Sequence, residues 1–256
     1  MRIQHNIMAM NANRNLTFNN TQMSKNLEKL SSGYRVNRAG DDAAGLAISE
    51  SMRRSIASYK QGINNANDGI SLIQTAEGAL TEVHSMLNRA QTLVTQRENG
   101  TLSDDDENKI KLELAELGTE VERIMDSTEF NGTKLLEGAL DVSINLGDAG
   151  TIDMTFEDAS GVTITEDMTA DDVKTNIETV STARAKLGAY QNRLEHTVNN
   201  MGVTMENLQN AESTIRDTNI AEEMMGYTKN NILIQSAQAM LAQANQVPQG
   251  VLQLMQ

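Results

Sequence analysis

The sequence contains no cysteine, no tryptophan and a single proline, and only 3% of its 256 residues are aromatic. The absence of cysteine excludes disulfides and thiolate metal sites. A globular core of this length normally relies on aromatic side chains, each of which buries a large area. The apolar residues here are instead aliphatic, with 15 methionines. Because Pro248 is the one proline, almost the whole chain is free to form helices packed by periodic apolar stripes.

Long apolar runs are also missing. No stretch approaches 18 consecutive apolar residues, so the sequence predicts no membrane-spanning helix. The segment 3–10 is too short and too polar for the apolar region of a secretory signal, and no small-residue cleavage site follows it. From these rules alone, the chain is expected to be cytosolic.

The net charge of −14 argues against nucleic acid as the main partner. Residues 131–172 carry ten acidic side chains and one basic side chain, which predicts a solvated acidic surface. Residues 1–60 carry nine basic and four acidic side chains, but the bases are dispersed and form no polybasic run. We therefore predict no nucleic-acid partner and no membrane partner.

Four long segments have the apolar periodicity of helices. Residues 12–30 repeat at seven-residue spacing and are followed by Gly33, a residue suited to closing a helix. Residues 43–97 carry one apolar stripe, over a length typical of coiled coils and bundles. A third helix is predicted to begin near Ser103, an N-cap followed by four acids. A fourth begins near Thr169 and keeps a strict seven-residue repeat.

The segment between the third and fourth helices changes in character, because glycine and threonine become frequent and apolar residues alternate with polar ones. The alternating apolar residues are Val142, Ile144 and Leu146, then Ile152, Met154 and Phe156. Turn residues at 147–150 separate the two runs. The pattern predicts a β-hairpin, with a further short strand near Val162–Ile164.

Both ends of the chain are apolar on one helical face and uncharged on the other. Residues 230–256 contain no charged side chain, and between Ile3 and Ser24 the only Lys or Arg is Arg14. A solvated helix normally carries charges on its wet face, and two isolated helices bury their stripes poorly. We therefore predict that the ends are disordered in the monomer and fold when they pack against other copies. A helical hairpin whose ends pair within one chain, and a membrane-surface helix, are the alternatives.

Several long motifs resemble those of bacterial flagellins. At the amino end, residues 7–12 read IMAMNA, residues 30–37 read LSSGYRVN and residues 41–48 read DDAAGLAI. At the carboxy end, residues 230–235 read NNILIQ, residues 238–246 read QAMLAQANQ and residues 248–254 read PQGVLQL. Residues 130–136, FNGTKLL, resemble the entry into the family's β-hairpin.

The resemblance implies a mainly α fold: a long antiparallel coiled-coil helical bundle with a small β-hairpin insert, and with the N- and C-terminal helices paired. Residues 1–42 and 216–256 would form a terminal coiled-coil domain in the inner tube of a filament. Residues 43–215 would form a helical bundle domain with the β-hairpin region at 131–172. The outer variable domains of the family are expected to be missing, since only that short region separates the long helices.

The resemblance also implies a function. The chain would be a structural subunit that self-assembles into the bacterial flagellar filament for motility, with no enzymatic activity, catalytic residue, cofactor or metal. It would be extracellular, exported unfolded without a cleaved signal peptide. The implied partners are further copies in a helical homo-polymer, an export chaperone that shields the stripe at 233–251, and filament cap and hook-junction proteins. A hook–filament junction or accessory filament protein is the alternative, and a chemoreceptor-like signalling hairpin lacks a membrane anchor.

Ten apolar residues on the stripes of the two ends are predicted to pack subunits together. They are Leu16, Met23, Leu27, Leu30, Leu233, Ile234, Met240, Leu241, Val251 and Leu254. Met224 and Met225 fit either packing within the chain or contact between subunits.

Many flagellins are recognised by Toll-like receptor 5 through the motif Gln-Arg-x-Arg-Glu-Leu on a long helix. Residues 88–93 read NRAQTL here, so Arg89 and Leu93 match the motif. Gln91 and Thr92 remove a cation and an anion. Glu113 is a further candidate receptor contact. Because charge-assisted contacts are lost, weakened recognition is expected.

Metal chemistry has little support in the sequence. The three histidines, His5, His84 and His196, are far apart and form no His-Glu-x-x-His motif. The acidic run at 104–107 lacks the spacing of a calcium-binding loop, and its place at a helix start accounts for it.

Overall fold

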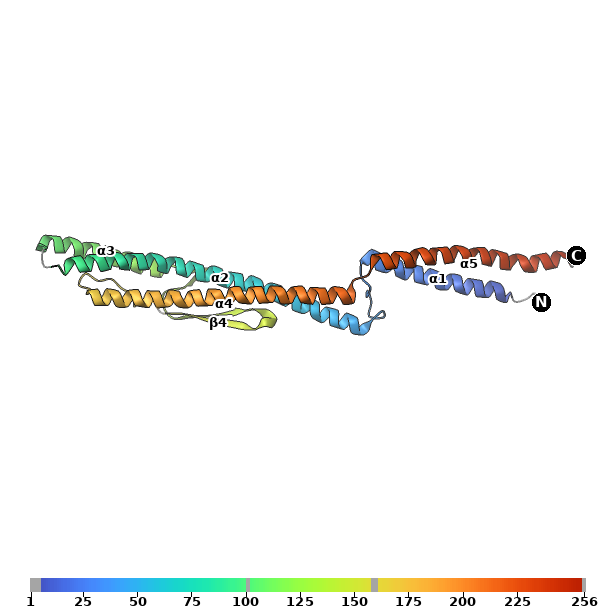
Figure 1. The fold of residues 1–256 in the computed structure, drawn as a ribbon, viewed down its shortest axis with the longest axis horizontal. Coiled ribbons are helices and arrows are strands. Elements are labelled where there is room, and N and C mark those ends of the chain that lie inside the picture. Colours follow the sequence, from blue (N-terminus) through green and yellow to red (C-terminus); the bar gives the residue numbers. More distant parts are fainter. Residues whose placement is uncertain (1–5, 100–101, 158–160, 255–256) are drawn as a thin grey trace. The chain divides into compact units, whose positions relative to one another are not determined.

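The computed structural model describes residues 6–99, 102–157 and 161–254, with the side chains of 248–254 left out. The described residues form five α-helices, four short β-strands and one 3₁₀ turn (Figure 1). The helices are α1 (Ile7–Ser32), α2 (Ala43–Arg97), α3 (Asp104–Ser127), α4 (Ala170–Arg216) and α5 (Ile220–Leu254). The strands are β1 (Glu129–Phe130), β2 (Thr133–Lys134), β3 (Leu140–Asn145) and β4 (Thr151–Phe156), with the turn η1 at Gly147–Ala149. The predicted mainly α fold is confirmed.

The chain divides into two compact units. Unit 1 comprises residues 1–54 and 207–256, and unit 2 comprises residues 55–206. The domain boundaries drawn from the sequence, at 42 and 216, stay a prediction.

The predicted helix ends are confirmed by their capping bonds. Gly33 takes a left-handed conformation, φ 74°, and its N–H donates to the Lys29 carbonyl at 2.8 Å. The Ser103 hydroxyl accepts the Asp106 N–H at 3.4 Å at the start of α3. Thr169 and Asp172 form a reciprocal capping box at the start of α4, in which the Asp172 N–H donates to the Thr169 hydroxyl. The Thr169 hydroxyl and N–H both donate to the Asp172 carboxylate, and these two bonds lower the pKa of Asp172.

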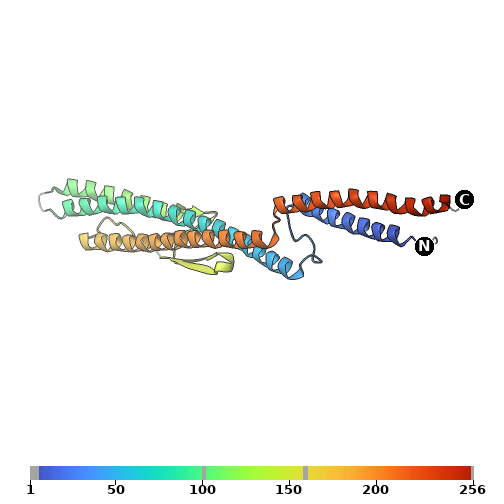
Figure 2. The ribbon, with the colours of Figure 1, turned by 45° about the vertical axis from the view of Figure 1, so that its right-hand side comes forward.

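Unit 2 is a bundle of most of α2, all of α3 and most of α4, which lie side by side (Figures 1 and 2). The apolar stripe predicted on α2 is half-buried over most of its N-terminal part and fully buried over its C-terminal half, at Ile73, Ala76, Leu80, Val83, Leu87, Ala90 and Val94. Facing stripes come from Ile110, Leu114 and Val121 of α3 and from Val180, Leu187, Leu194 and Met201 of α4. The fully buried apolar residues of these three helices are aliphatic, and the tyrosines Tyr59 of α2 and Tyr190 of α4 pack against this core from its edge, where they are half-buried.

The predicted hairpin is β3–β4. The strands are antiparallel, with Val142 opposite Met154 and Ile144 opposite Ile152. Strand β4 buries its alternate residues Ile152, Met154 and Phe156, as the period of two requires.

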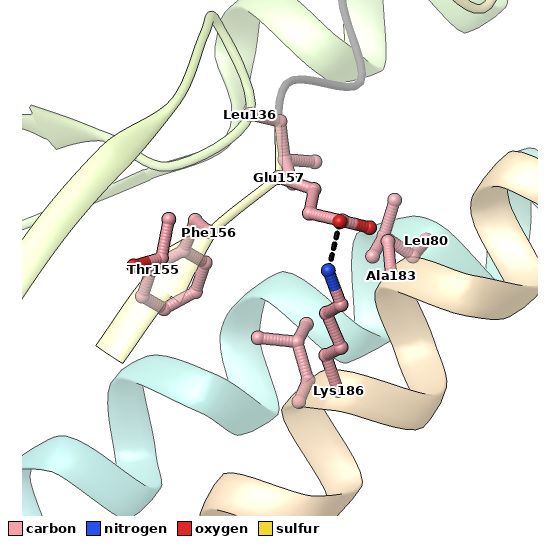
Figure 3. A pocket seen from close by; sticks show the side chains of 8 residues that line it. Leu80, Leu136, Thr155, Phe156, Glu157, Ala183 and Lys186 are labelled. Atoms are coloured by element: carbon pink, nitrogen blue, oxygen red, sulfur yellow. Dashed lines mark hydrogen bonds and ion pairs between the residues drawn. The ribbon is translucent and has the colours of Figure 1, made fainter. Parts of the chain in front are cut away.

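A seam joins the end of the hairpin to the bundle (Figure 3). Phe156 lies there with Leu80, Leu136 and Ala183, and Lys186 of α4 forms an ion pair with Glu157. The hollow left between these side chains is about 10 Å³, which is room for one water at most. This seam is therefore packing and not a ligand site.

The predicted strand near Val162–Ile164 is wrong. Both residues are buried, but the segment is irregular and pairs with no described strand. Its backbone packs on helices instead. A Cβ on Gly118 of α3 would lie 2.2 Å from the Ile164 carbonyl oxygen, and Asn176 of α4 donates to the Thr163 carbonyl at 2.8 Å. The alternation of apolar residues correctly indicated that Val162 and Ile164 are buried. The hydrogen bond to this segment, however, comes from the Asn176 side chain and not from a neighbouring strand.

The short pair β1–β2 was not predicted. Its turn is Asn131-Gly132, both with positive φ, and Asn-Gly is the strongest short hairpin signal. The Asn131-Gly132 pair could therefore have been used to predict this hairpin from the sequence.

Unit 1 contains α1 and α5, which lie side by side and run antiparallel (Figure 1). The long fourth helix ends at Arg216, and α5 begins at Ile220, ten residues before the predicted terminal helix. The break is held by residues 33–35. The Arg35 N–H donates to the Arg216 carbonyl at 2.7 Å, and the Thr218 N–H donates to the Gly33 carbonyl at 3.0 Å.

Candidate assembly surface

The register of α1 against α5 is set by contacts spread along the pair. Lys29 forms an ion pair with Glu223 at 3.0 Å. A Cβ on Gly226 would lie 2.6 Å from a terminal atom of the Asn26 side-chain amide, so this glycine allows the helices to approach closely. At the other end, the Asn6 side chain donates to the Ala244 carbonyl at 2.7 Å. The helices are therefore in contact from one end of α1 to the other.

The seam between α1 and α5 is nevertheless shallow. No residue of α1 is buried, and among the side chains described in α5 only Ile234 and Ala244 are buried. Two helices alone cannot enclose an apolar seam. One chain therefore leaves much of the apolar surface of unit 1 in water.

The structure divides the ten predicted packing residues into three groups. Ile234 is buried, and Leu16, Met23, Leu30 and Leu241 are half-buried. Leu27, Leu233 and Met240 are exposed, Met240 to 63%. The side chains of Val251 and Leu254 lie outside the described residues. The buried and half-buried residues belong to the seam between α1 and α5 of one chain. In a single copy, the exposed residues Leu27, Leu233 and Met240 remain accessible to solvent.

Five exposed apolar residues form one strip on α5, which we call the α5 ridge. They are Met225, Ile232, Leu233, Met240 and Val247. At 100° per residue they span about 100° of the helix circumference, next to the buried stripe. Leu233, Met240 and Val247 follow each other at seven-residue spacing. A contiguous exposed apolar strip on a soluble helix is typical of a protein–protein contact.

Helix α1 carries a second exposed apolar face. Ile7 and Phe18 are each 61% exposed and are eleven residues apart, which is three helical turns. Met8 and Met10 are exposed nearby. The sequence pattern did not predict this face, because the seven-residue repeat of α1 indicates the half-buried stripe instead.

The break before α5 is organised around two arginines that the sequence did not single out. The Arg216 guanidinium lies 4.7 Å from the centroid of the Tyr34 ring and 2.8 Å from the Glu50 carboxylate. Arg35 donates to the carbonyls of Thr214 and Ile215 at the end of α4. Satisfying these carbonyls stabilises the helix end.

The two aspartates of the motif DDAAGLAI hold the loop that enters α2. Asp42 accepts the Gly45 N–H at 2.9 Å and so caps α2. Asp41 accepts the N–H groups of Arg38 and Asn37, and these bonds lower its pKa, with a smaller contribution from nearby lysines. Both carboxylates are therefore explained by loop structure.

The candidate receptor residues lie in unit 2. Arg89 of α2 and Glu113 of α3 form an exposed ion pair, with a nitrogen–oxygen distance of 2.7 Å. Leu93 is only 3% exposed and packs in the core. Direct receptor contact by Leu93 is thus inconsistent with its position, whereas Arg89 and Glu113 stay candidates.

Within residues 6–99, 102–157 and 161–254, no group of three or more His, Asp or Glu side chains is placed to hold a metal ion. Across the same ranges, no helix is both long and apolar enough to cross a bilayer.

Two protein-family models match most of the chain. The model of the bacterial flagellin N-terminal helical region matches residues 3–141, and that of the C-terminal helical region matches residues 170–255. The chain belongs to the bacterial flagellin family. It is a short flagellin, because only residues 142–169 lie between the two matched regions.

Two relatives with full-length similarity agree with this assignment. A flagellin of Halalkalibacterium halodurans is 50% identical over 271 aligned residues that cover all of both chains. A flagellin of Bacillus subtilis is 46% identical, again with full coverage of both chains. The crystal structure of Bacillus cereus flagellin matches 54% of this chain and 88% of its own, with 30% identity and a TM-score of 0.49.

The family gives this flagellin its role as a structural subunit of the flagellar filament, which serves motility. The family is structural and not enzymatic. An uncovered apolar surface on unit 1 is consistent with that role, since a filament subunit is surrounded by copies of itself.

Proposed function

We propose that this flagellin polymerises by packing the α5 ridge and the exposed face of α1 against neighbouring copies. The observation that carries the proposal is the exposure of five apolar side chains on one strip of α5. Fully burying one such side chain stabilises by about 1.5–3 kcal/mol. Covering the ridge would therefore offset part of the entropy lost when subunits associate.

The polar faces of the same helices support the proposal. Residues 230–256 carry no charged side chain, so a neighbour can approach this part of α5 from several sides without desolvating a charged side chain. Amide side chains can exchange their hydrogen bonds with water for bonds to a neighbouring copy.

Seeded growth tests the proposal. Purified chain mixed with sheared filament fragments should lengthen the fragments, as viewed by electron microscopy. A chain lacking residues 230–256, which removes Ile232, Leu233, Met240 and Val247 of the ridge, should not lengthen them. Elongation by the truncated chain at the rate of the full chain would contradict the proposal.

The same surface suggests how the subunit is handled before assembly. We propose that an export chaperone covers the stripe at 233–251 in the cell, and that the chain is exported unfolded without a cleaved signal. Cap and hook-junction proteins would meet the chain at the growing filament outside the cell. The support is the exposed ridge, which would otherwise promote premature association. A processed amino end in protein recovered from filaments would contradict uncleaved export.

Recognition by Toll-like receptor 5 is proposed to be weak, through Arg89 and Glu113. Two charges of the family motif are absent at Gln91 and Thr92. We expect a reporter-cell potency at least about tenfold below that of a flagellin with the full motif, since a charge-assisted hydrogen bond contributes about 1.5–3 kcal/mol. The double variant Gln91→Arg, Thr92→Glu should recover potency. Equal potency of the unmodified chain would contradict the proposal.

A further inference from the structure

Helix α5 contains a proline in its interior, at Pro248. In an α-helix the N–H of each residue donates to the carbonyl four residues earlier, and proline has no backbone N–H. The carbonyl of Ala244 therefore has no donor within its own helix. Ala244 is buried, and a backbone carbonyl left unpaired in a buried position costs stability.

The missing donor comes from the other end of the chain. The Asn6 side-chain nitrogen donates to the Ala244 carbonyl at 2.7 Å, across 238 residues of sequence. The oxygen of the same amide accepts the Ala9 N–H at 3.1 Å and caps α1. An asparagine can make both bonds because its amide carries an acceptor and donors on separate atoms. One side chain thus closes the start of α1 and completes the interrupted turn of α5.

We propose that Asn6 and Pro248 together form a register clasp, in which Asn6 is a positioning residue that aligns α1 with α5. In a regular helix the interior carbonyls are already paired. Sliding α5 by one residue would bring Asn6 to such a carbonyl and leave that of Ala244 unpaired. Proline therefore marks one carbonyl of α5 as the partner of Asn6.

The clasp complements the contacts at the opposite end of the pair. There, Lys29 bonds Glu223, and the Gly33 carbonyl accepts from Thr218. The Asn6 bond secures the end of α1 that is farthest from this joint. Since all these contacts lie within one chain, the inference does not depend on which surface joins neighbouring copies.

A double-mutant cycle tests the clasp through the critical concentration for polymerisation, measured as the protein left in the supernatant after filaments are sedimented. Asn6→Ser keeps a good N-cap but shortens the arm that reaches Ala244. We expect it to raise the critical concentration about tenfold, or about 1.4 kcal/mol. In a Pro248→Ala background the helix supplies its own N–H, so the same change should have less than about a twofold effect.

Asn15→Ser is the matched control, because Asn15 is an exposed amide on the same helix and Asn and Ser have similar helix propensities. It should leave the critical concentration unchanged. Equal effects of Asn6→Ser in both backgrounds would overturn the clasp, since the residue would then act only as a cap. No effect in the native background, or an equal effect of Asn15→Ser, would also overturn it.

A second measurement decides the matter if Pro248→Ala chains do not assemble. Solid-state NMR of labelled native filaments should show a contact between the Asn6 side-chain nitrogen and the Ala244 carbonyl carbon. The Ala244 carbonyl shift should move in Asn6→Ser filaments, while that of the exposed Ala242 should not. Absence of the contact in native filaments would overturn the proposal.

Discussion

Met240→Glu is expected to abolish elongation of filament seeds, with a critical concentration more than about 100-fold above that of the native chain. Met240 lies at the centre of the α5 ridge and is 63% exposed in one chain. If a neighbour covers it, the variant loses about 1.5–3 kcal/mol of apolar burial. It also places an unpaired carboxylate in a desolvated contact, which costs several kcal/mol more. Together these costs exceed the 2.8 kcal/mol or so that a 100-fold change represents.

Met240→Leu is the matched control for this substitution. It keeps the volume and apolar character of the side chain, and such exchanges usually cost less than about 1.5 kcal/mol even in a core. Seeds should therefore lengthen at nearly the native rate. Because Met240 lies in unit 1, both variants should leave the unfolding transition of unit 2 unchanged by circular dichroism. Native-rate elongation by Met240→Glu would remove the ridge as the surface between copies.

Gly118→Ala is expected to destabilise unit 2 by about 1–3 kcal/mol, which is the usual cost of overpacking a close contact. The added Cβ would lie 2.2 Å from the Ile164 carbonyl oxygen, and a backbone atom cannot move away as a flexible side chain can. The segment that would have to shift also buries Val162, Ile164 and Met168. Urea unfolding of the full-length monomer, followed by circular dichroism, measures the change.

Gly78→Ala provides a control of opposite sign. Gly78 is also inside a helix, and no atom lies within 4 Å of a Cβ placed there. Alanine is better than glycine in a helix by about 1 kcal/mol, so this variant should stabilise unit 2. If both substitutions stabilise equally, the close approach of the 161–168 segment to α3 is wrong.

The helices could be predicted because each carries its own signal. The stripe from Ile73 to Val94 on α2 and the repeat from Val180 to Met201 on α4 match the period of one helix face, and these residues are buried. The caps at Ser103 and Thr169 act within a few residues, so local sequence is enough to find them. The hairpin β3–β4 also has a local cause, in its alternation and turn residues.

The remaining features depend on partners that are distant in sequence. Val162 and Ile164 alternate like a strand, but their segment packs on helices through contacts with Gly118 and Asn176, which lie in other elements of the fold. The break at 217–219 is held by hydrogen bonds with residues 33–35, which are also distant in sequence. The spacing of apolar residues along one segment cannot show which other segment supplies its contacts and hydrogen bonds.

The candidate assembly surface was predicted in part. Sequence placed Leu233, Ile234, Met240 and Leu241 on one broad stripe. The structure separates them, because α1 covers Ile234 and partly covers Leu241 while Leu233 and Met240 stay exposed. The rotation of α5 about its own axis decides which side of the broad stripe faces α1. The sequence pattern does not specify this rotation.

The antiparallel pairing of α1 and α5 has a practical consequence for labelling. Asn6 bonds Ala244, so the amino end of α1 lies beside the carboxy-terminal part of α5. Dyes placed at the start of α1 and near residue 244 of α5 would consequently report on nearly the same location. Energy transfer between dyes at these two positions of one molecule would be high whether or not neighbours are present. Distances between subunits in a filament must therefore be measured with singly labelled molecules.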